Sequence, residues 1–206
     1  MTFPTNRGRT FPPEPLTSAE VRQLLDQTSR RAPAGVRMRA LIAVLYGGGL
    51  RVSEALALRP SDVDTGHCLL RVRDGKGGRP RTVALDRRSC ELVDAWLTAR
   101  RDLGLTGRHP LFATYERGTV RASFGQPLSP IYVRRRLAEL GAKAGIEKRV
   151  HPHGLRHSLA FDLAQRGTPT HVIQAQLGHA SLAVTDRYVR HLMPADLVAA
   201  MADREW

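Results

Sequence analysis

Hydrophobic residues recur at helical spacing along most of this chain, and only one stretch changes to a period of two. Leu70 and Val72 alternate with polar residues, and so do Val83 and Leu85. Between the two pairs lies the sequence Asp-Gly-Lys-Gly-Gly of residues 74–78. Alternation on both sides of a glycine-rich turn is typical of a β-hairpin. The sequence therefore predicts a mainly α fold with a small antiparallel β-sheet, of the α+β class.

Start and stop signals divide the helical segments. Thr17 and Glu20 form a Thr-x-x-Glu capping box, which predicts the start of a helix. Residues 32–35 predict a break, the glycines at 47–49 end the second helix, and Pro60 ends the third. The predicted helices cover residues 17–30, 36–46, 52–58, 87–102, 130–144, 154–166, 169–177, 181–191 and 195–203. Residues 104–128 are predicted to be loop with little strand.

The length of 206 residues fits one domain, and 42% hydrophobic residues are enough for a buried core. Residues 1–15 contain four prolines and no hydrophobic period, so we expect a flexible N-terminal arm before a domain at 16–206. No apolar run approaches the roughly 20 residues that span a membrane. With no signal-type segment at the start, the chain is expected to be soluble and cytoplasmic. Cys68 and Cys90 match no disulfide or metal pattern, which favours ordinary core positions.

The charge points to a polyanionic partner. The formal net charge is +13, which favours nucleic acid over a membrane surface. Only three of the 32 basic residues are lysines, and arginine suits bidentate phosphate contacts, although GC-rich coding would also replace lysine by arginine. The excess lies in the first three quarters of the chain, because residues 151–206 are neutral. The last quarter is therefore expected to serve something other than general attraction to DNA.

Four short segments carry residues suited to phosphate chemistry, and each is weak alone. Arg51 follows the glycines at 47–49 and starts a helix, where a positive charge opposes the helix dipole unless an anion or Glu54 compensates it. Lys76 lies in the hairpin turn, where a lysine is usually solvated surface. His153 and Arg156 are three residues apart, so they share one face of a helix. The fourth segment is Leu-Gly-His at 177–179, followed nine residues after His179 by Tyr188.

Taken together and in this order, these segments resemble the tyrosine recombinases of the phage integrase family, including the Xer-type enzymes. The resemblance covers about residues 16–203. It is carried by Gly-Leu-Arg-Val-Ser-Glu at 49–54, Gly-Lys-Gly at 75–77, His-Gly-Leu-Arg-His at 153–157, Leu-Gly-His at 177–179 and Thr-Asp-Arg-Tyr at 185–188. It implies the catalytic-domain fold of that family and site-specific DNA recombination, with DNA binding and integration.

The resemblance also implies a role for each matching residue. Arg51 and Arg156 would bind the non-bridging oxygens of the scissile phosphate, with His179 as a further donor. Tyr188 would be the nucleophile, His153 a general acid and base, and Lys76 the donor to the leaving 5′-oxygen. Glu54 would support Arg51 from behind. His157 matches a frequent residue of the family but has no assigned chemical step.

The residue types fit that chemistry. A phosphodiester gains negative charge toward its five-coordinate transition state, and guanidinium groups fixed in advance stabilise that charge. A tyrosine hydroxyl has a pKa near 10 and needs a base or a cationic setting to attack at neutral pH. The leaving alkoxide needs a proton donor. A phosphotyrosyl link conserves the ester energy, so the reaction needs neither ATP nor a metal, and the sequence shows no metal-ligand spacing.

Double-stranded DNA is the expected partner. The resemblance implies a tetramer on paired sites, and a monomer is the open alternative for the free chain. Of the four tyrosines only Tyr188 follows Leu-Gly-His at the distance found in the family. Tyr132 lies beside an arginine triplet that is equally compatible with DNA contact and with a solvated helix face. The candidate DNA-binding residues are Arg79, Arg81, Tyr132, Arg134, Arg135 and Arg136.

Several alternatives stay open at this point. Most family members carry a core-binding domain before the catalytic domain, and its absence here fits either a fragment or a naturally short recombinase. The apolar helix predicted at 195–203 could pack on a neighbouring protomer or on its own core. A type IB topoisomerase-like enzyme would share the chemistry, and a DNA-binding protein with lapsed chemistry would not need Tyr188.

Overall fold

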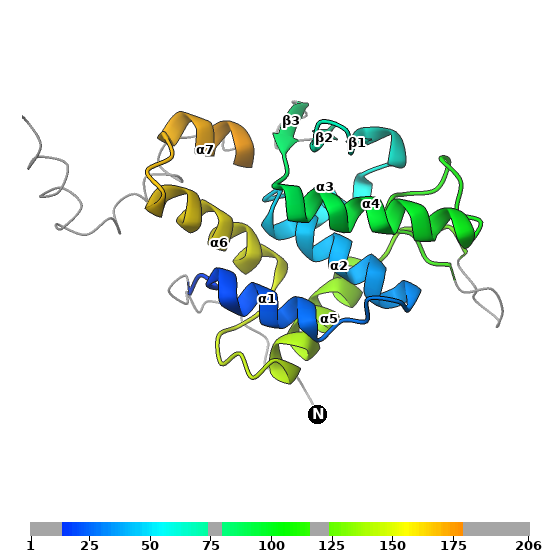
Figure 1. The fold of residues 1–206 in the computed structure, drawn as a ribbon, viewed down its shortest axis with the longest axis horizontal. Helices are drawn as coiled ribbons and strands as arrows, with labels where there is room; N and C mark the ends of the chain where they lie inside the picture. Colours follow the sequence, from blue (N-terminus) through cyan, green and yellow to red (C-terminus); the bar gives the residue numbers. More distant parts are fainter. Residues whose placement is uncertain (1–13, 74–79, 116–123, 179–206) are drawn as a thin grey trace, which may run out of the picture.

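The computed structural model describes residues 14–73, 80–115 and 124–178. Its elements follow one another in the order shown in Figure 1. They are α1 (Ser18–Asp26), α2 (Pro33–Tyr46), α3 (Val52–Ala57), the 3-10 turn η1 (Pro60–Asp62), β1 (Val63–Asp64), β2 (Leu69–Val72), β3 (Arg81–Ala84), α4 (Arg87–Asp102), α5 (Pro130–Lys143), α6 (Pro152–Gln165) and α7 (Thr170–Leu177). The mainly α fold with a small antiparallel sheet is confirmed.

The hairpin predicted from the change of period is present. Strands β2 and β3 pair antiparallel with Leu70 opposite Val83, and both of these side chains are buried. The prediction missed β1, which pairs with β2 and gives the sheet order β1-β2-β3. Two residues are too few to display an alternating pattern, so β1 leaves no signal in the sequence.

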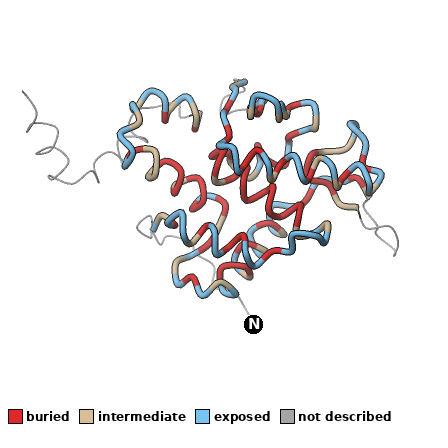
Figure 2. Tube along the Cα trace, in the orientation of Figure 1, coloured by how far each residue is buried: buried red, intermediate tan, exposed pale blue. Residues whose placement is uncertain are grey.

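Helix α2 forms the centre of the molecule. It packs against α4 and α6, and Figure 2 shows it as the most continuously buried segment. Every residue from Val36 to Leu45 is buried, including Arg37 and Arg39. The two arginines bind backbone carbonyls: Arg37 Nη1 donates to Ala113 O at 2.7 Å, and Arg39 Nη1 to Leu25 O at 2.7 Å. A helix that is buried all round serves as the frame on which the other elements are placed.

The first two helices differ from their predicted bounds. The capping box at Thr17 is present, but α1 ends at Asp26 rather than near residue 30. Helix α2 starts at Pro33, inside the predicted break, because proline is well suited to the first position of a helix. Gly35 is then a helical residue, and its missing Cβ leaves room for the backbone of Ser29.

The later elements lie close to their predictions. Helix α4 has the predicted bounds, and α5, α6 and α7 begin or end within two residues of theirs. The loop of 104–128 contains one isolated bridge, between Ala113 and Pro127, in its described part. Cys90 is buried and Cys68 half-buried, as expected of core residues. Among the described residues no helix is long and apolar enough to cross a membrane.

Helix α7 is fastened to the sheet by one side chain. Gln176 Oε1 accepts from Ala84 N at 3.1 Å, and Gln176 Nε2 donates to Ala84 O at 2.8 Å. The same amide nitrogen donates to Gly48 O at 3.3 Å. Gln176 therefore pairs with β3 as a neighbouring strand would, and it holds the end of α7 beside the turn that precedes α3.

Candidate active site

The turn between α2 and α3 brings Arg51 to the site. Gly49 has φ +65°, and a Cβ there would lie 2.7 Å from side-chain atoms of Leu159 and of Leu177. Glycine is therefore required at position 49 both for its backbone angle and for its close approach to α6 and α7. Arg51 follows as the N-cap residue of α3.

Glu54 compensates the positive charge at the start of α3. Its carboxylate accepts from Arg51 N at 2.8 Å and from Arg51 Nη1 at 2.6 Å. The side chain of Glu54 is only 3% exposed. Burial alone would raise the pKa of Glu54, but hydrogen bonds from Arg81 and Arg51 outweigh it and lower this pKa to about 2. Glu54 is therefore a fixed anion beneath the guanidinium of Arg51.

Arg81 also binds Glu54, which changes the interpretation of this residue. Its Nη1 and Nη2 lie 3.0 Å and 2.9 Å from the two carboxylate oxygens of Glu54, and its side chain is 12% exposed. Arg81 was expected to face DNA, but its guanidinium is directed into the protein. The hairpin pattern contains the signal for this, because residues 81 and 83 share one face of a strand and Val83 is buried.

Arg156 on α6 reaches the same carboxylate from the other side. It is 3% exposed, and its Nη1 lies 3.9 Å from Glu54 Oε2. Nη1 donates to Gly49 O and Nη2 donates to Leu177 O, each at 2.6 Å. The guanidinium therefore joins the turn before α3 to the end of α7, and its position is fixed before any ligand arrives.

A cavity of about 330 Å³ opens over this cluster. It brings Arg51, His153 and Arg156 together, although they come from segments about a hundred residues apart. Its lining residues are Leu50, Arg51, Val52, Ser53, Arg134, Arg149, His151, Pro152, His153 and Arg156. Two fixed guanidinium groups and an imidazole around one hollow form a site for an anion such as a phosphate. Lys76, His179 and Tyr188 lie outside the described residues.

A family model described as the Phage integrase family matches residues 14–194. The chain belongs to the phage integrase family. Tyrosine recombinase XerC 2 of Ralstonia nicotianae is 37% identical over 84% of this chain and 48% of its own. Tyrosine recombinase XerA of Pyrococcus furiosus is 37% identical over 86% of this chain and 57% of its own. The chain thus spans about half the length of the curated relatives it matches.

Solved structures of recombinases share this fold. The crystal structure of XerA recombinase superposes with a TM-score of 0.75 at 29% identity, covering 99% of this chain and 68% of that one. XerH site-specific recombinase, solved with palindromic difH substrate in a post-cleavage complex, gives a TM-score of 0.71 at 28% identity. That match covers 93% of this chain and 53% of the XerH chain.

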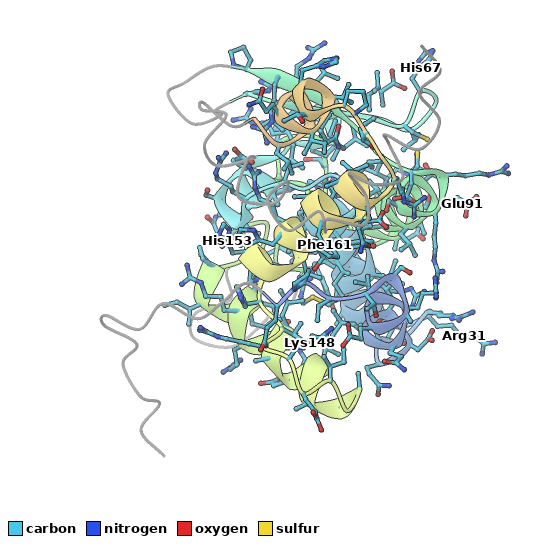
Figure 3. The ribbon with its side chains drawn as sticks, turned by 90° about the vertical axis from the view of Figure 1, so that its left-hand side faces the viewer. Arg31, His67, Glu91, Lys148, His153 and Phe161 are labelled. Atoms are coloured by element: carbon cyan, nitrogen blue, oxygen red, sulfur yellow. The ribbon has the colours of Figure 1, made fainter. Side chains whose placement is uncertain are left out.

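His153, labelled in Figure 3, lies at the start of α6 and lines the cavity. Partial desolvation of its ring, together with the positive charges of Arg156 and Arg51, lowers the pKa of His153 below its usual 6.5. The imidazole is therefore neutral at pH 7 and has a nitrogen lone pair that can accept a proton.

The arginine triplet of α5 divides between two surroundings. Arg135 and Arg136 pair with Glu139, and the Arg135 guanidinium also lies 6.0 Å from the ring centre of Tyr132. Arg134 instead lines the cavity. Arg149, which the sequence reasoning missed, lines it beside Arg134. The surroundings of Arg79 lie outside the part of the chain that the structure describes.

His151 was also missed, and it caps α6. Its Nδ1 accepts from Gly154 N at 3.1 Å, which requires an unprotonated nitrogen. Desolvation, followed by the charges of Arg149 and His153, lowers the pKa of His151 to about 4. The sequence His151-Pro152 contains a signal for this capping role. Proline favours the first position of a helix, so the residue before it is expected at the N-cap.

This cap predicts a loss of stability in mild acid. The folded-state pKa of His151 lies below the unfolded value of 6.5, so its contribution is complete above that pH and is lost as the pH falls toward 4. We expect the free energy of unfolding to fall by about 1–2 kcal/mol from this cap over that window. His151→Asn keeps an acceptor that does not titrate, so urea titrations should show a smaller loss in this variant. An identical pH dependence in both proteins would contradict the prediction.

Proposed function

We propose that this chain catalyses site-specific DNA recombination, cleaving and rejoining strands through a 3′-phosphotyrosyl bond at Tyr188. The observation that carries the proposal is the cavity in which Arg51 and Arg156 converge beside His153, with Glu54 fixing the arginines from below. Residues 16–206 are proposed to form the catalytic domain. Membership of the phage integrase family supports the same reaction.

Each group has a proposed step. Arg51 and Arg156 bind the non-bridging oxygens of the scissile phosphate, and they stabilise the charge that develops in the five-coordinate transition state. Neutral His153 accepts the proton of the tyrosine hydroxyl as the new O–P bond forms. Lys76 gives a proton to the leaving 5′-oxygen, and His179 donates a further hydrogen bond to the phosphate. A second 5′-hydroxyl reverses the step, so the ester energy is conserved.

Double-stranded DNA is the proposed partner. XerH is solved with its difH substrate, and the positive charge of this chain suits the same class of ligand. We further propose that active assemblies are tetramers on two paired sites in the cytoplasm, and that the free chain is a monomer.

The proposal is tested by trapping the covalent intermediate. The chain is mixed, without metal or ATP, with a pool of labelled duplexes from the DNA flanking its gene, each nicked close to a candidate cleavage point. Cleavage then releases a short fragment and leaves protein attached to DNA, which survives denaturation on a gel. The expected result is a shifted band that disappears in Tyr188→Phe while DNA binding persists. If the chain, fused to a core-binding domain and mixed with the known site of that domain, still forms no covalent complex, the result would favour a DNA-binding protein that does not cleave DNA.

The arginines of α5 are expected to differ in DNA binding. A second cavity of about 260 Å³ shares Arg134, Arg149 and His151 with the first, which extends the basic hollow along the surface. Among the described residues no acidic side chain lies within ion-pair distance of Arg134 or Arg149, whereas Arg135 is paired with Glu139. Arg134 is therefore proposed to bind a backbone phosphate next to the scissile one.

Arg134→Gln should weaken DNA binding and reduce the salt dependence of log K by about one phosphate contact. Arg135→Gln, on the same helix, is the matched control and should change both quantities less. Binding isotherms at several salt concentrations provide the measurement. Equal losses in the two variants would show that the triplet acts only through its overall charge.

A further inference from the structure

Helix α6 holds a second histidine against the proposed general base. His153 and His157 are four residues apart, so they face each other on successive turns. Their Nε2 atoms lie 2.5 Å apart, their ring centres 3.9 Å apart, and the rings are inclined by 77°. His157 is half-buried, whereas His153 is exposed and lines the cavity. The recombination steps proposed above leave His157 without a role.

The contact between the two nitrogens restricts where the protons can be. Two neutral imidazole nitrogens cannot both direct lone pairs at each other over a hydrogen-bond distance, so one of them must carry a hydrogen and donate it. If His153 Nε2 donates to His157 Nε2, the remaining nitrogen of His153, Nδ1, keeps its lone pair. That tautomer is the one able to accept a proton from an attacking hydroxyl at Nδ1.

We propose that His157 is a positioning residue that holds His153 in the tautomer with its proton on Nε2. The inference rests on the proposed function, in which His153 is the base. The tyrosine O–H bond breaks, its proton moves to His153 Nδ1, and the oxygen forms the new bond to phosphorus. The His153 imidazolium then donates a charge-assisted hydrogen bond from Nε2 to His157, which stabilises it at the moment the proton is held. A carboxylate has this orienting role in catalytic triads, and here a neutral imidazole has it.

The surroundings explain why a neutral partner suits this position. The charged and titratable groups that line the cavity with His153 are Arg51 at the start of α3, Arg134 on α5, Arg149 in the loop before α6, His151 at the N-cap of α6 and Arg156 on α6. The arginines disfavour a second positive charge. They are also needed to bind the phosphate, so a carboxylate beside His153 would compete with the phosphate for the guanidinium groups. An imidazole accepts the hydrogen bond without bringing a negative charge.

The first test needs no DNA. Nitrogen-15 spectra of the histidine rings report which nitrogen of each neutral imidazole carries the proton. In the full chain, His153 is expected to be mainly in the Nε2–H form, and in His157→Leu it should become a mixture of both tautomers. His171→Leu, which removes an exposed histidine of α7, is the matched control and should leave the His153 signals unchanged. The same tautomer in wild type and His157→Leu would overturn the proposal.

The second test measures the rate of covalent complex formation on a nicked duplex selected from the pool. His157→Leu should reduce this rate about 10–100-fold with an unchanged Kd for DNA, as expected for loss of a group that orients a reacting side chain. The pH at which the rate of covalent complex formation falls to half of its maximum should also differ between His157→Leu and the wild-type chain, because His153 loses its hydrogen-bond partner. His157→Gln offers an amide oxygen as acceptor and should restore most of the rate.

The outcomes separate this inference from the function on which it rests. Equal losses in the leucine and glutamine variants, with no change in the pH profile, would assign His157 a packing role and overturn the inference. If wild-type chain forms no covalent complex on any duplex, the proposed function fails, and the tautomer comparison still decides whether His157 orients His153. Melting temperatures of all variants identify any that lose the fold, and for these the tautomer is compared in His157→Gln.

Discussion

Glu54→Gln is expected to lower the free energy of unfolding by about 3–5 kcal/mol, as removal of one partner from a buried ion pair commonly does. The carboxylate binds Arg51 and Arg81 directly, and Arg156 lies 3.9 Å away. A neutral amide would leave these guanidinium groups repelling one another in a poorly solvated place. Arg51 and Arg156 would separate, and covalent complex formation should fall together with stability.

Urea titrations of the two proteins provide the measurement, with Glu139→Gln as the matched control. Glu139 pairs with Arg135 and Arg136 on an exposed helix face, so its loss should cost about 0–1 kcal/mol. The pH dependence is a second check. The folded-state pKa of Glu54 is about 2, below its ordinary 4.5, so its contribution is complete above about pH 5 and is lost as the pH falls toward 2. Glu54→Gln should lack that acid loss, and similar costs for Glu54→Gln and Glu139→Gln would contradict the account.

Arg156→Lys is expected to reduce the rate of covalent complex formation by at least about 100–1000-fold, the range for loss of one fixed transition-state donor. Lysine keeps the charge, but a single ammonium group cannot reproduce the several N–H donors that a planar guanidinium holds in fixed directions. In the native chain the guanidinium donates to the carbonyls of Gly49 and Leu177 at 2.6 Å, and Arg156 also lines the cavity. The variant should therefore bind DNA with little change and react slowly.

Single-turnover rates at saturating protein separate these two effects. Arg166→Lys is the matched control, since Arg166 follows the same helix and forms an exposed pair with Asp162. Its rate should match that of the wild-type chain. An Arg156→Lys variant that forms the intermediate at the wild-type rate would show that charge alone is needed at this position. The proposal that the planar guanidinium of Arg156 binds the phosphate oxygens would then be wrong.

Local patterns in the sequence predicted most of the fold. The change of period at residues 70–85 located the hairpin, and α4 followed from its spacing of apolar residues. The hairpin and α4 depend on neighbours along the chain, and such neighbours are visible in a sequence. The expectation that Arg51, His153 and Arg156 share a site came instead from the resemblance to the tyrosine recombinases.

Features that depend on three-dimensional neighbours were missed or misjudged. Arg81 was named as a candidate DNA-binding residue, and the structure shows that its guanidinium binds Glu54 from the face of β3 that also carries buried Val83. The triplet on α5 could not be divided without knowing that Glu139 lies one turn away from two of its members and that the cavity lies beside the third. Arg149 and His151 line the cavity together with Arg51, which lies about a hundred residues away along the chain.

The two hydrogen bonds between Gln176 and Ala84 have a consequence for solubility. Strand β3 lies at the border of the three-stranded sheet, and unpaired backbone groups at such a border can recruit a strand from another molecule and start aggregation. At Ala84 both of these groups are already occupied by an amide of the same chain. The Gln176 side chain thus prevents a further strand from pairing with β3 at Ala84. A leucine at position 176 would leave the N–H and C=O of Ala84 open to neighbouring molecules at high concentration.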